Sequence, residues 1–212
     1  MIEKLQQQAD GEGDVAHSIS IPDSNQRSPL HWAAAADEHD GWRYYNSSFK
    51  KNKLLESIKI LLAAGANPLA QDGHGRTPIS LAAGAGRCDV VQALLDDPSC
   101  GPVALSLEDN SGALPLHRAA EGGHSDVLKF LISPLAGVGI DTGGLFVNRT
   151  ALHVCAALGH DEAAKACLQL GASHSQQDSS GASPLHAAAE YGHMDVLSTL
   201  IKAGGELDLS DG

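Results

Sequence analysis

The side chains in this sequence that are best suited to catalysis or metal binding are those of cysteine and histidine. Cys155 lies close along the chain to His153 and His160, and a thiol beside an imidazole is the composition of a nucleophile with its general base. All three residues, however, occupy ordinary positions of a pattern that recurs along the chain. We therefore interpret them as structural and expect no enzyme activity.

The eleven histidines of the 212-residue chain also raise the question of a metal site. Neither they nor the four cysteines show the ligand spacing of a zinc finger, so we expect no bound metal. The run Gly84-Ala85-Gly86 resembles a phosphate-binding loop only superficially, because it lies between two expected helices rather than after a strand. No cofactor is indicated.

The histidines instead mark a unit that occurs five times. Four of its openings have histidine as the fourth residue, and Ser80 replaces it in the second opening. Other histidines recur in the turn between the two expected helices of a unit. The first residues of successive openings are 49, 37, 36 and 33 positions apart. The openings begin at Ser28, Thr77, Leu114, Thr150 and Ser183.

Each unit is expected to contain two helices. In the last unit, Ser183 can cap the first free amides and Pro184 suits the first helical turn, whereas Leu114 should weaken its cap by roughly 1 kcal/mol. Alanines follow, and a glycine such as Gly192 ends the first helix. The second helix carries apolar residues at helical spacing, and turns with aspartate and glycine join the units.

A unit of about 33 residues with this opening resembles the ankyrin repeat, over Asp23 to Leu209. The resemblance implies an all-α solenoid of helix-turn-helix units joined by β-hairpin loops, in which neighbouring units share their stability. It also implies that the histidines of the openings bind the backbone of the hairpins. We expect an N-terminal cap segment at 1–22 and an ankyrin-repeat domain at 23–212, with repeats at about 23–71, 72–108, 109–146, 147–177 and 178–212.

The first repeat carries an insertion at 37–53, before a second helix expected over Leu54 to Leu62. Aromatic side chains and arginine are enriched at interface anchors, so the insertion is a candidate contact surface. The alternative is that its rings fold back onto their own repeat, and an insertion could do both. The candidate residues are Trp42, Arg43, Tyr44, Tyr45 and Phe49.

The resemblance further implies a concave binding surface built from hairpin tips and exposed positions of the first helices. Arginine directly precedes three openings, and we expect these arginines to contact carboxylates of a partner. The alternative is that they pair with acidic residues of the tips such as Asp72; solvated pairs contribute only about 0–1 kcal/mol and would leave the arginines available. The matching positions are Arg27, His74, Arg76, Asn110, Ser111, Glu121, Phe146, Arg149, Leu158, Glu190 and Tyr191.

Composition limits the partners. The net charge of −12 argues against a nucleic-acid surface, and no apolar run is long enough for membrane insertion. The cysteines favour a reducing, intracellular setting, cytoplasmic or nuclear. We therefore predict a protein-interaction scaffold that binds a protein or peptide, with an acidic partner as the first hypothesis. The oligomeric state is not indicated.

Two alternatives remain open. The last helix keeps an apolar outer side and Asp211-Gly212 would begin a further hairpin, so the chain could be the regulatory array of a larger enzyme or channel. Alternatively, Trp42, Tyr44 and Tyr45 could form an aromatic cage that reads methyl-lysine peptides.

Overall fold

The structure is a computed structural model that describes residues 19–35, 47–132 and 139–204, with only the backbone for 47–52. The part of the chain that it describes is helical, apart from turns and loops. The predicted cap at 1–22 falls mostly outside the described residues. So do the side chains of the proposed aromatic-basic surface (Trp42, Arg43, Tyr44, Tyr45 and Phe49) and the terminal pair Asp211-Gly212.

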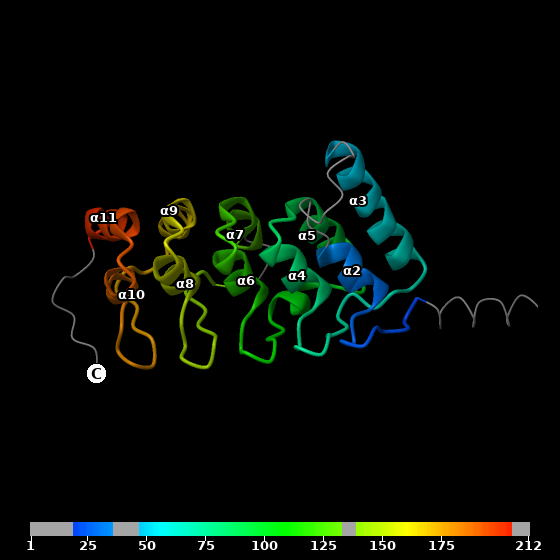
Figure 1. Cartoon of the computed structure of the whole chain (residues 1–212), viewed down its shortest axis with the longest axis horizontal. Helices are drawn as coiled ribbons and strands as arrows, with labels where there is room; N and C mark the ends of the chain where they lie inside the picture. The colour runs from blue at the N-terminus through cyan, green and yellow to red at the C-terminus, as the bar shows by residue number, and fades with distance from the viewer. Residues whose placement is uncertain (1–18, 36–46, 133–138, 205–212) are drawn as a thin grey trace, which may run out of the picture.

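The helices form two parallel rows, one above the other, with the connecting loops hanging from the lower row (Figure 1). Each first helix packs against the first helices of the neighbouring repeats and against its own second helix. This confirms the predicted all-α solenoid. The lower row is α2 (Pro29–Ala35), α4 (Pro78–Gly84), α6 (Pro115–Glu121), α8 (Ala151–Leu158) and α10 (Pro184–Glu190). The upper row is α3 (Ser47–Ala63), α5 (Cys88–Leu95), α7 (Ser125–Leu131), α9 (Asp161–Gln169) and α11 (Met194–Lys202). A short 3₁₀ helix, η1 (Pro102–Leu105), precedes the third loop.

Helix α3 is longer than the sequence pattern predicted. We expected it to begin at Leu54, but it begins at Ser47, so the second part of the insertion extends the helix rather than forming a loop. The physical reason is that Ser47 to Lys53 contains no glycine or proline, and adding residues to an existing helix is favourable. In Figure 1, α3 projects beyond the other helices of its row.

The loops between repeats end in tight turns, which we call tips 1 to 5. No strand occurs among the described residues, and the one β-type pairing there is an isolated bridge between Gly144 and Arg149. Main-chain hydrogen bonds join successive tips; for example, the amide of Asn110 donates to the carbonyl of His74 at 2.9 Å. The tips span residues 23–27, 72–76, 109–113, 144–149 and 178–182.

Small side chains let the first helices approach one another closely. The second alanine of each of the first three openings, Ala34, Ala83 and Ala120, is fully buried, as is Ala156 in the fourth repeat. Valine and leucine of the second helices complete a core that runs along the whole array. Because no repeat has a core of its own, stability must be shared between neighbours, as the resemblance implied.

Histidines of the openings connect each repeat to the next one. Nε2 of His31, His117 and His153 lies 3.0, 2.8 and 3.1 Å from a backbone carbonyl oxygen of the following tip. Nδ1 of His153 accepts a hydrogen bond from the amide of Thr150 at 3.2 Å. Since a carbonyl only accepts and an amide only donates, the imidazole must be neutral with its proton on Nε2. The predicted role of these histidines is therefore confirmed.

The missing members of this pattern have clear consequences. Ser80 cannot reach the next tip, and its hydroxyl donates instead to the carbonyl of Thr77 at 2.9 Å. Leu114 offers no side-chain cap, but its amide still donates to Nδ1 of His117 at 3.2 Å. The third repeat thus keeps the bond from the capping residue's amide to the histidine. The expected weakening of the cap applies only to the missing bond of the capping side chain.

A second set of histidines connects each repeat to the previous one. Nε2 of His124, His160 and His193 lies 3.0, 2.9 and 2.9 Å from a carbonyl oxygen near the end of the preceding first helix. The imidazole lies directly against the turn glycine of that repeat. A Cβ atom built on Gly159 would lie 2.5 Å from Nδ1 of His193. Glycine is needed there both for space and for its positive φ of 77°.

We predict that Gly159→Ala destabilises the protein more than Gly192→Ala. Both glycines have positive φ, 77° and 73°, so either alanine is strained by about 1 kcal/mol. Only at Gly159 would the new Cβ also meet His193, since nothing lies within 4 Å of a Cβ on Gly192. We expect an additional loss of about 1–3 kcal/mol for Gly159→Ala in urea denaturation. Equal losses would show that the imidazole contact adds nothing.

We also predict that the free energy of unfolding falls as the pH is lowered from 7 to about 5. Burial lowers the pKa of His31, His117 and His153 from the ordinary 6.5, so below pH 6.5 the unfolded chain binds more protons than the folded one. Each histidine can contribute a slope of up to about 1.4 kcal/mol per pH unit. His153→Gln should flatten the slope in urea titrations at several pH values; a slope equal to that of the parent chain would contradict this origin.

Candidate functional site

The predicted binding residues lie mainly on the tips, and tips 2, 3 and 5 are built around buried aspartates. In tip 2, the Asp72 carboxylate accepts hydrogen bonds from the amides of His74 and Arg76, both at 2.9 Å. Its side chain is completely buried. Burial alone raises the pKa of Asp72, but hydrogen bonds from Arg76 and His74 outweigh it and hold the pKa below its usual range. The aspartate therefore remains ionised and requires a cation.

Arginines of the same tip supply that cation in tips 1 and 2. Arg76 Nη2 lies 2.8 Å from Asp72 Oδ2, and Arg27 Nη2 lies 2.8 Å from Asp23 Oδ2. Arg27 also stacks over the ring of Trp32, 4.0 Å from its centroid, and the Trp32 indole donates to Asp23 at 3.0 Å. Trp32, which is 54% exposed, is a surface residue that our sequence reasoning missed.

In tip 3 the cation comes from a helix. Ala113 stands where tips 1 and 2 have arginine, and Arg118 of α6 reaches the tip instead. Its Nε donates to Asp109 Oδ2 at 2.8 Å, and its Nη1 donates to Glu121 at 2.6 Å. The sequence signal for Arg118 was available, because an aspartate without its tip arginine must find another partner. We had assigned Glu121 to the binding surface, but its carboxylate is engaged with Arg118.

In tip 5 the cation comes from the neighbouring repeat. Ala182 replaces the tip arginine, and Arg149 of tip 4 donates to Asp178 Oδ2 at 3.1 Å. Burial alone raises the pKa of Asp178, but hydrogen bonds from Ser180, Arg149 and the Ala182 amide lower it to about 2.

These ion pairs correct our expectation for the arginines. We assumed that any pairing would be solvated, but the carboxylates of Asp72, Asp109 and Asp178 are at most 1% exposed. Removing one partner of such a pair leaves a buried charge uncompensated. The arginines are therefore part of the fold. The side chains of Arg76 and Arg149 are nevertheless 32% and 31% exposed, so each guanidinium still presents one edge to solvent.

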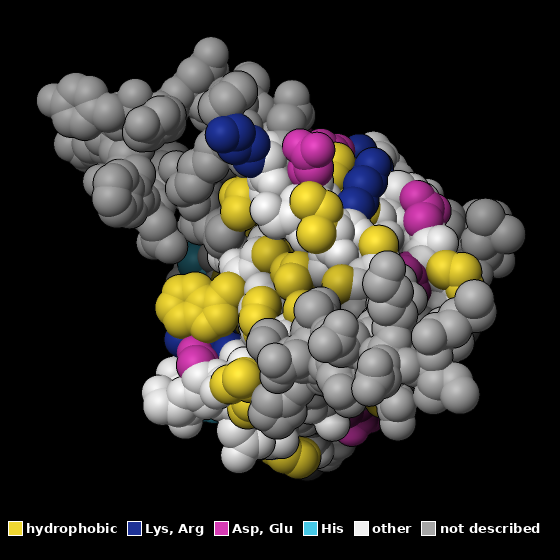
Figure 2. Space-filling view, turned by 90° about the vertical axis from the view of Figure 1, so that its right-hand side faces the viewer, with side chains coloured by type: hydrophobic (Ala, Val, Ile, Leu, Met, Phe, Trp, Pro, Cys, Tyr) yellow, Lys and Arg dark blue, Asp and Glu magenta, His cyan; other side chains and the backbone are white. Residues whose placement is uncertain are grey.

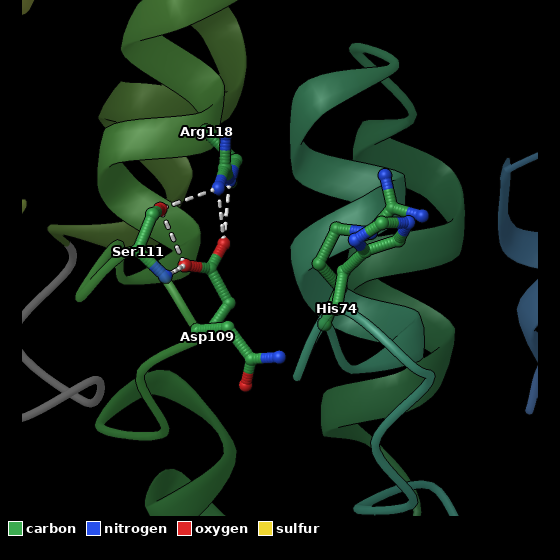
Figure 3. Close-up of a pocket in the computed structure, with 6 residues that line it drawn as sticks. His74, Asp109, Ser111 and Arg118 are labelled. Atoms are coloured by element: carbon green, nitrogen blue, oxygen red, sulfur yellow. Dashed lines mark hydrogen bonds and ion pairs between the residues drawn. The ribbon is translucent and has the colours of Figure 1, made fainter. Parts of the chain in front are cut away.

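A pocket of about 320 Å³ opens between tips 2 and 3. It lies at the boundary between the second and third repeats, where Ser80 replaces the opening histidine and offers no imidazole to bond to the next tip. Figure 3 shows Asp109 and Ser111 bonded to Arg118 on one side and His74 on the other side. The side chain of Asn110 is tied to Gly73 by a hydrogen bond of 3.2 Å. The lining residues are His74, Arg76, Asp109, Asn110, Ser111 and Arg118.

The polar groups that this pocket offers to a ligand are mainly hydrogen-bond donors. Both oxygens of Asp109 already accept bonds from Ser111, Ala113 and Arg118. Arg76 donates hydrogen bonds to Asp72 from Nε and Nη2, and its Nη1 forms no hydrogen bond with a described residue. A guanidinium with an open donor edge beside an exposed imidazole suits a carboxylate or a peptide carbonyl.

The remaining predicted residues are exposed in the second half of the array. Phe146 of tip 4 is 82% exposed, and Leu158 and Tyr191 at the ends of α8 and α10 are about half exposed. Glu190 is also exposed. The predicted residues at tips 1 to 3 are thus polar, whereas those further along the array include the large apolar side chains of Phe146, Leu158 and Tyr191 beside the polar Arg149 and Glu190.

The opposite end of the molecule also exposes apolar side chains. Figure 2 looks onto the end formed by α2 and α3, where hydrophobic side chains gather. Ile21 and Trp32 are each a little over half exposed there. The proposed insertion surface begins beside this end, but its side chains lie outside the described residues.

The candidate nucleophile Cys155 has no catalytic environment. Its thiol is fully buried, and its interaction with the Cys167 thiol together with burial raises its pKa well above the usual range. The imidazoles of His153 and His160 are committed to backbone carbonyls. Among the described residues, no group of three or more histidine, cysteine or acidic side chains is placed to hold a metal ion. None of the described helices has the length and apolarity needed to span a membrane.

Comparison with known proteins identifies a family. The family model described as ankyrin repeats (three copies) matches residues 47–143 and 135–211. The B-cell lymphoma 3 protein homolog of Mus musculus is 30% identical over 158 residues, which are 74% of this chain and 35% of that protein. The probable 26S proteasome regulatory subunit p28 of Saccharomyces cerevisiae is 31% identical over 191 residues, 89% of this chain and 76% of that protein.

A solved structure agrees with these sequence matches. The crystal structure of the ankyrin repeat domain of Bcl-3 superposes with a TM-score of 0.73 and 26% identity, covering 91% of this chain and 77% of that one. The chain thus spans only about a third of the mouse B-cell lymphoma 3 protein homolog but most of the solved repeat domain.

We predict that Asp109→Asn destabilises the protein by about 2 kcal/mol or more, because it places an amide against the Arg118 guanidinium in a buried site. Asp126→Asn is the matched control, since Asp126 is exposed in the first turn of α7 and its loss should cost less than about 1 kcal/mol. Urea denaturation measures both variants. If Asp109→Asn costs no more than the control, the tip ion pair has no structural role.

Proposed function

The chain belongs to the ankyrin-repeat family, and we propose that it is an interaction module that holds an acidic segment of a partner protein along its tips and the ends of its first helices. The fold serves this role by presenting side chains in fixed positions. A surface that is already ordered loses little conformational entropy on binding, so contacts convert more fully into affinity.

The observation that carries this proposal is the pocket between tips 2 and 3. In a chain with a net charge of −12, Arg76 and Arg118 line one open recess, and the carboxylates of Asp72 and Asp109 with which they pair are at most 1% exposed. The exposed imidazole of His74 adds a further donor. A carboxylate of a partner can approach the open edge of Arg76 and the His74 imidazole without displacing either structural ion pair.

The relatives support the general class. The yeast relative is named as a regulatory subunit of the 26S proteasome, which is a role within a protein assembly. The chain covers too little of the mouse B-cell lymphoma 3 protein homolog to carry over that whole protein's partners. We therefore describe the partner of this chain only by its chemistry.

The insertion of the first repeat belongs to the same proposal. Trp42, Arg43, Tyr44, Tyr45 and Phe49 combine aromatic and basic side chains, which suits an interface anchor. An aromatic cage for methyl-lysine and a regulatory array within a larger protein remain alternatives that no described residue favours. The free thiols of Cys88, Cys100, Cys155 and Cys167 support an intracellular setting, cytoplasmic or nuclear.

We predict that peptides selected on this chain from a random phage library are enriched in aspartate and glutamate. His74→Glu should weaken the binding of the best selected peptide by at least roughly fivefold in fluorescence polarisation, because it places a like charge in the recess. Ser198→Glu changes the net charge equally on the exposed face of α11 and should leave affinity unchanged.

Two results would contradict the proposal: no enrichment of acidic residues, or equal effects of the two variants. A chain without residues 37–46 tests the insertion in the same assay. That deletion leaves α3 intact from Ser47, and an unchanged affinity would remove the insertion from the proposed surface.

A further inference from the structure

We infer that the binding surface is divided by chemistry along the array, so that its partner segment carries an acidic part and a bulky apolar part in a fixed order. The acidic part lies over tips 1 to 3, and the apolar part lies over tip 4 and the ends of α8 and α10. This inference rests on the proposed function and specifies its partner further.

Tip 4 is built differently from the tips on either side of it. Gly144 stands where the other tips have aspartate, and a Cβ there would lie 2.7 Å from both the His117 ring and the Gly112 carbonyl. An aspartate therefore cannot occupy this position. Without the carboxylate, tip 4 holds no ion pair of its own, and its one arginine, Arg149, serves Asp178 of tip 5.

The loss of the aspartate is accompanied by a strained apolar turn. Leu145 and Phe146 have φ values of 61° and 53°, although both are large residues without the freedom of glycine. Such conformations cost of order 1–3 kcal/mol each and persist where the surroundings enforce them. Here the Leu145 amide donates to Gly112 of tip 3 and the Val147 carbonyl accepts from Ser179 of tip 5, both at 2.8 Å.

This arrangement displays an aromatic ring instead of burying it. Phe146 is 82% exposed, while the two flanking hydrogen bonds hold the backbone on both sides of it. If the exposed ring had no role, the backbone around it would not need to be both strained and fixed on each side. The geometry is that of a rigid anchor for an apolar pocket or side chain of a partner.

The ends of the first helices change character at the same boundary. The residue before the turn glycine is Ala85 in the second repeat and Gly122 in the third, whereas it is Leu158 and Tyr191 in the fourth and fifth. Gly122 cannot be enlarged, because a Cβ would lie 2.4 Å from the His124 ring. The surface is therefore necessarily shallow beside the arginine tips and is filled by large side chains further along.

Hydrogen bonds and ring contacts fix these side chains and tip 4 relative to the neighbouring repeats. Tyr191 stacks on His193 with ring centroids 6.5 Å apart, and His193 is hydrogen-bonded to the carbonyl of Ala157, the neighbour of Leu158. Tip 4 is joined in turn to tip 3 through its hydrogen bond to Gly112. Because tip 4 follows tip 3 directly, a single extended segment can reach from the arginine tips to Phe146. Charge complementarity fixes which part of the segment lies at which end.

The test compares four fluorescein-labelled probes: tetraglutamate, the tripeptide leucyl-tryptophyl-leucine, and the two joined by a short glycine linker in either order. The better of the two joined probes should bind at least roughly tenfold more tightly than tetraglutamate, since linkage makes the second contact intramolecular. Phe146→Ala should reduce this probe to the affinity of tetraglutamate and leave tetraglutamate itself unaffected. His74→Glu should weaken tetraglutamate and the joined probe but not the tripeptide.

Controls separate binding from folding. Phe146 is mostly exposed, so its alanine variant should keep the circular dichroism and urea midpoint of the parent chain. Ile60→Ala removes an equally apolar side chain, 63% exposed on α3, and should change no affinity. Leu158→Ala is a second variant on the apolar part and should act in the same direction as Phe146→Ala.

The outcomes distinguish the two proposals. If tetraglutamate binds but neither joined probe binds more tightly, or if Phe146→Ala weakens tetraglutamate as much as the joined probe, the divided surface is wrong and the proposed function stands. If tetraglutamate fails to bind the parent chain, recognition of acidic partners is wrong, and the inference falls with it.

Discussion

The structure depends on neutral imidazoles held between two backbone groups. His117 and His153 each accept from the amide at the start of their own helix and donate to a carbonyl of the next tip. A second set of histidines reaches back to the preceding helix end, against turn glycines such as Gly159. Both bonds have defined lengths, so together they fix the distance between repeats. Alanine in the first helices and glycine in the turns follow from that distance, because larger side chains would not fit.

The tips are governed by a different constraint, the burial of aspartate. A buried carboxylate needs a cation, but it does not determine where in the sequence the cation comes from. Arg76 comes from the same tip, Arg118 from the following helix and Arg149 from the preceding tip. A regular spacing of arginines was therefore the wrong pattern to follow. The feature that tips 2, 3 and 5 share is the buried aspartate, and the outward guanidinium edges of a strongly acidic protein are a consequence of its need for a cation.

The departures from regularity coincide with the candidate binding features. The pocket lies where Ser80 interrupts the histidine bridges, and the exposed Phe146 lies where Gly144 interrupts the aspartates. Regular positions are committed to holding repeats together, as their burial and hydrogen bonds show. Positions released from that task can be specialised, which is a physical reason to look for function in the irregular repeats.

The sequence by itself determined the repeat and the helix pairs, because capping, helical periodicity and turn chemistry act over a few residues. The all-α solenoid and the structural role of the histidines were implied by the resemblance of that repeat to the ankyrin repeat. It did not reveal that α3 begins at Ser47, since helix extension there depends on no distinctive local signal. Only the tertiary structure showed that Arg76 and Arg149 serve buried aspartates, that Arg118 supplies the cation where tip 3 has no arginine, and that Phe146 is held outward. Those facts depend on which repeats touch, and contact between residues distant in sequence sets burial and pairing.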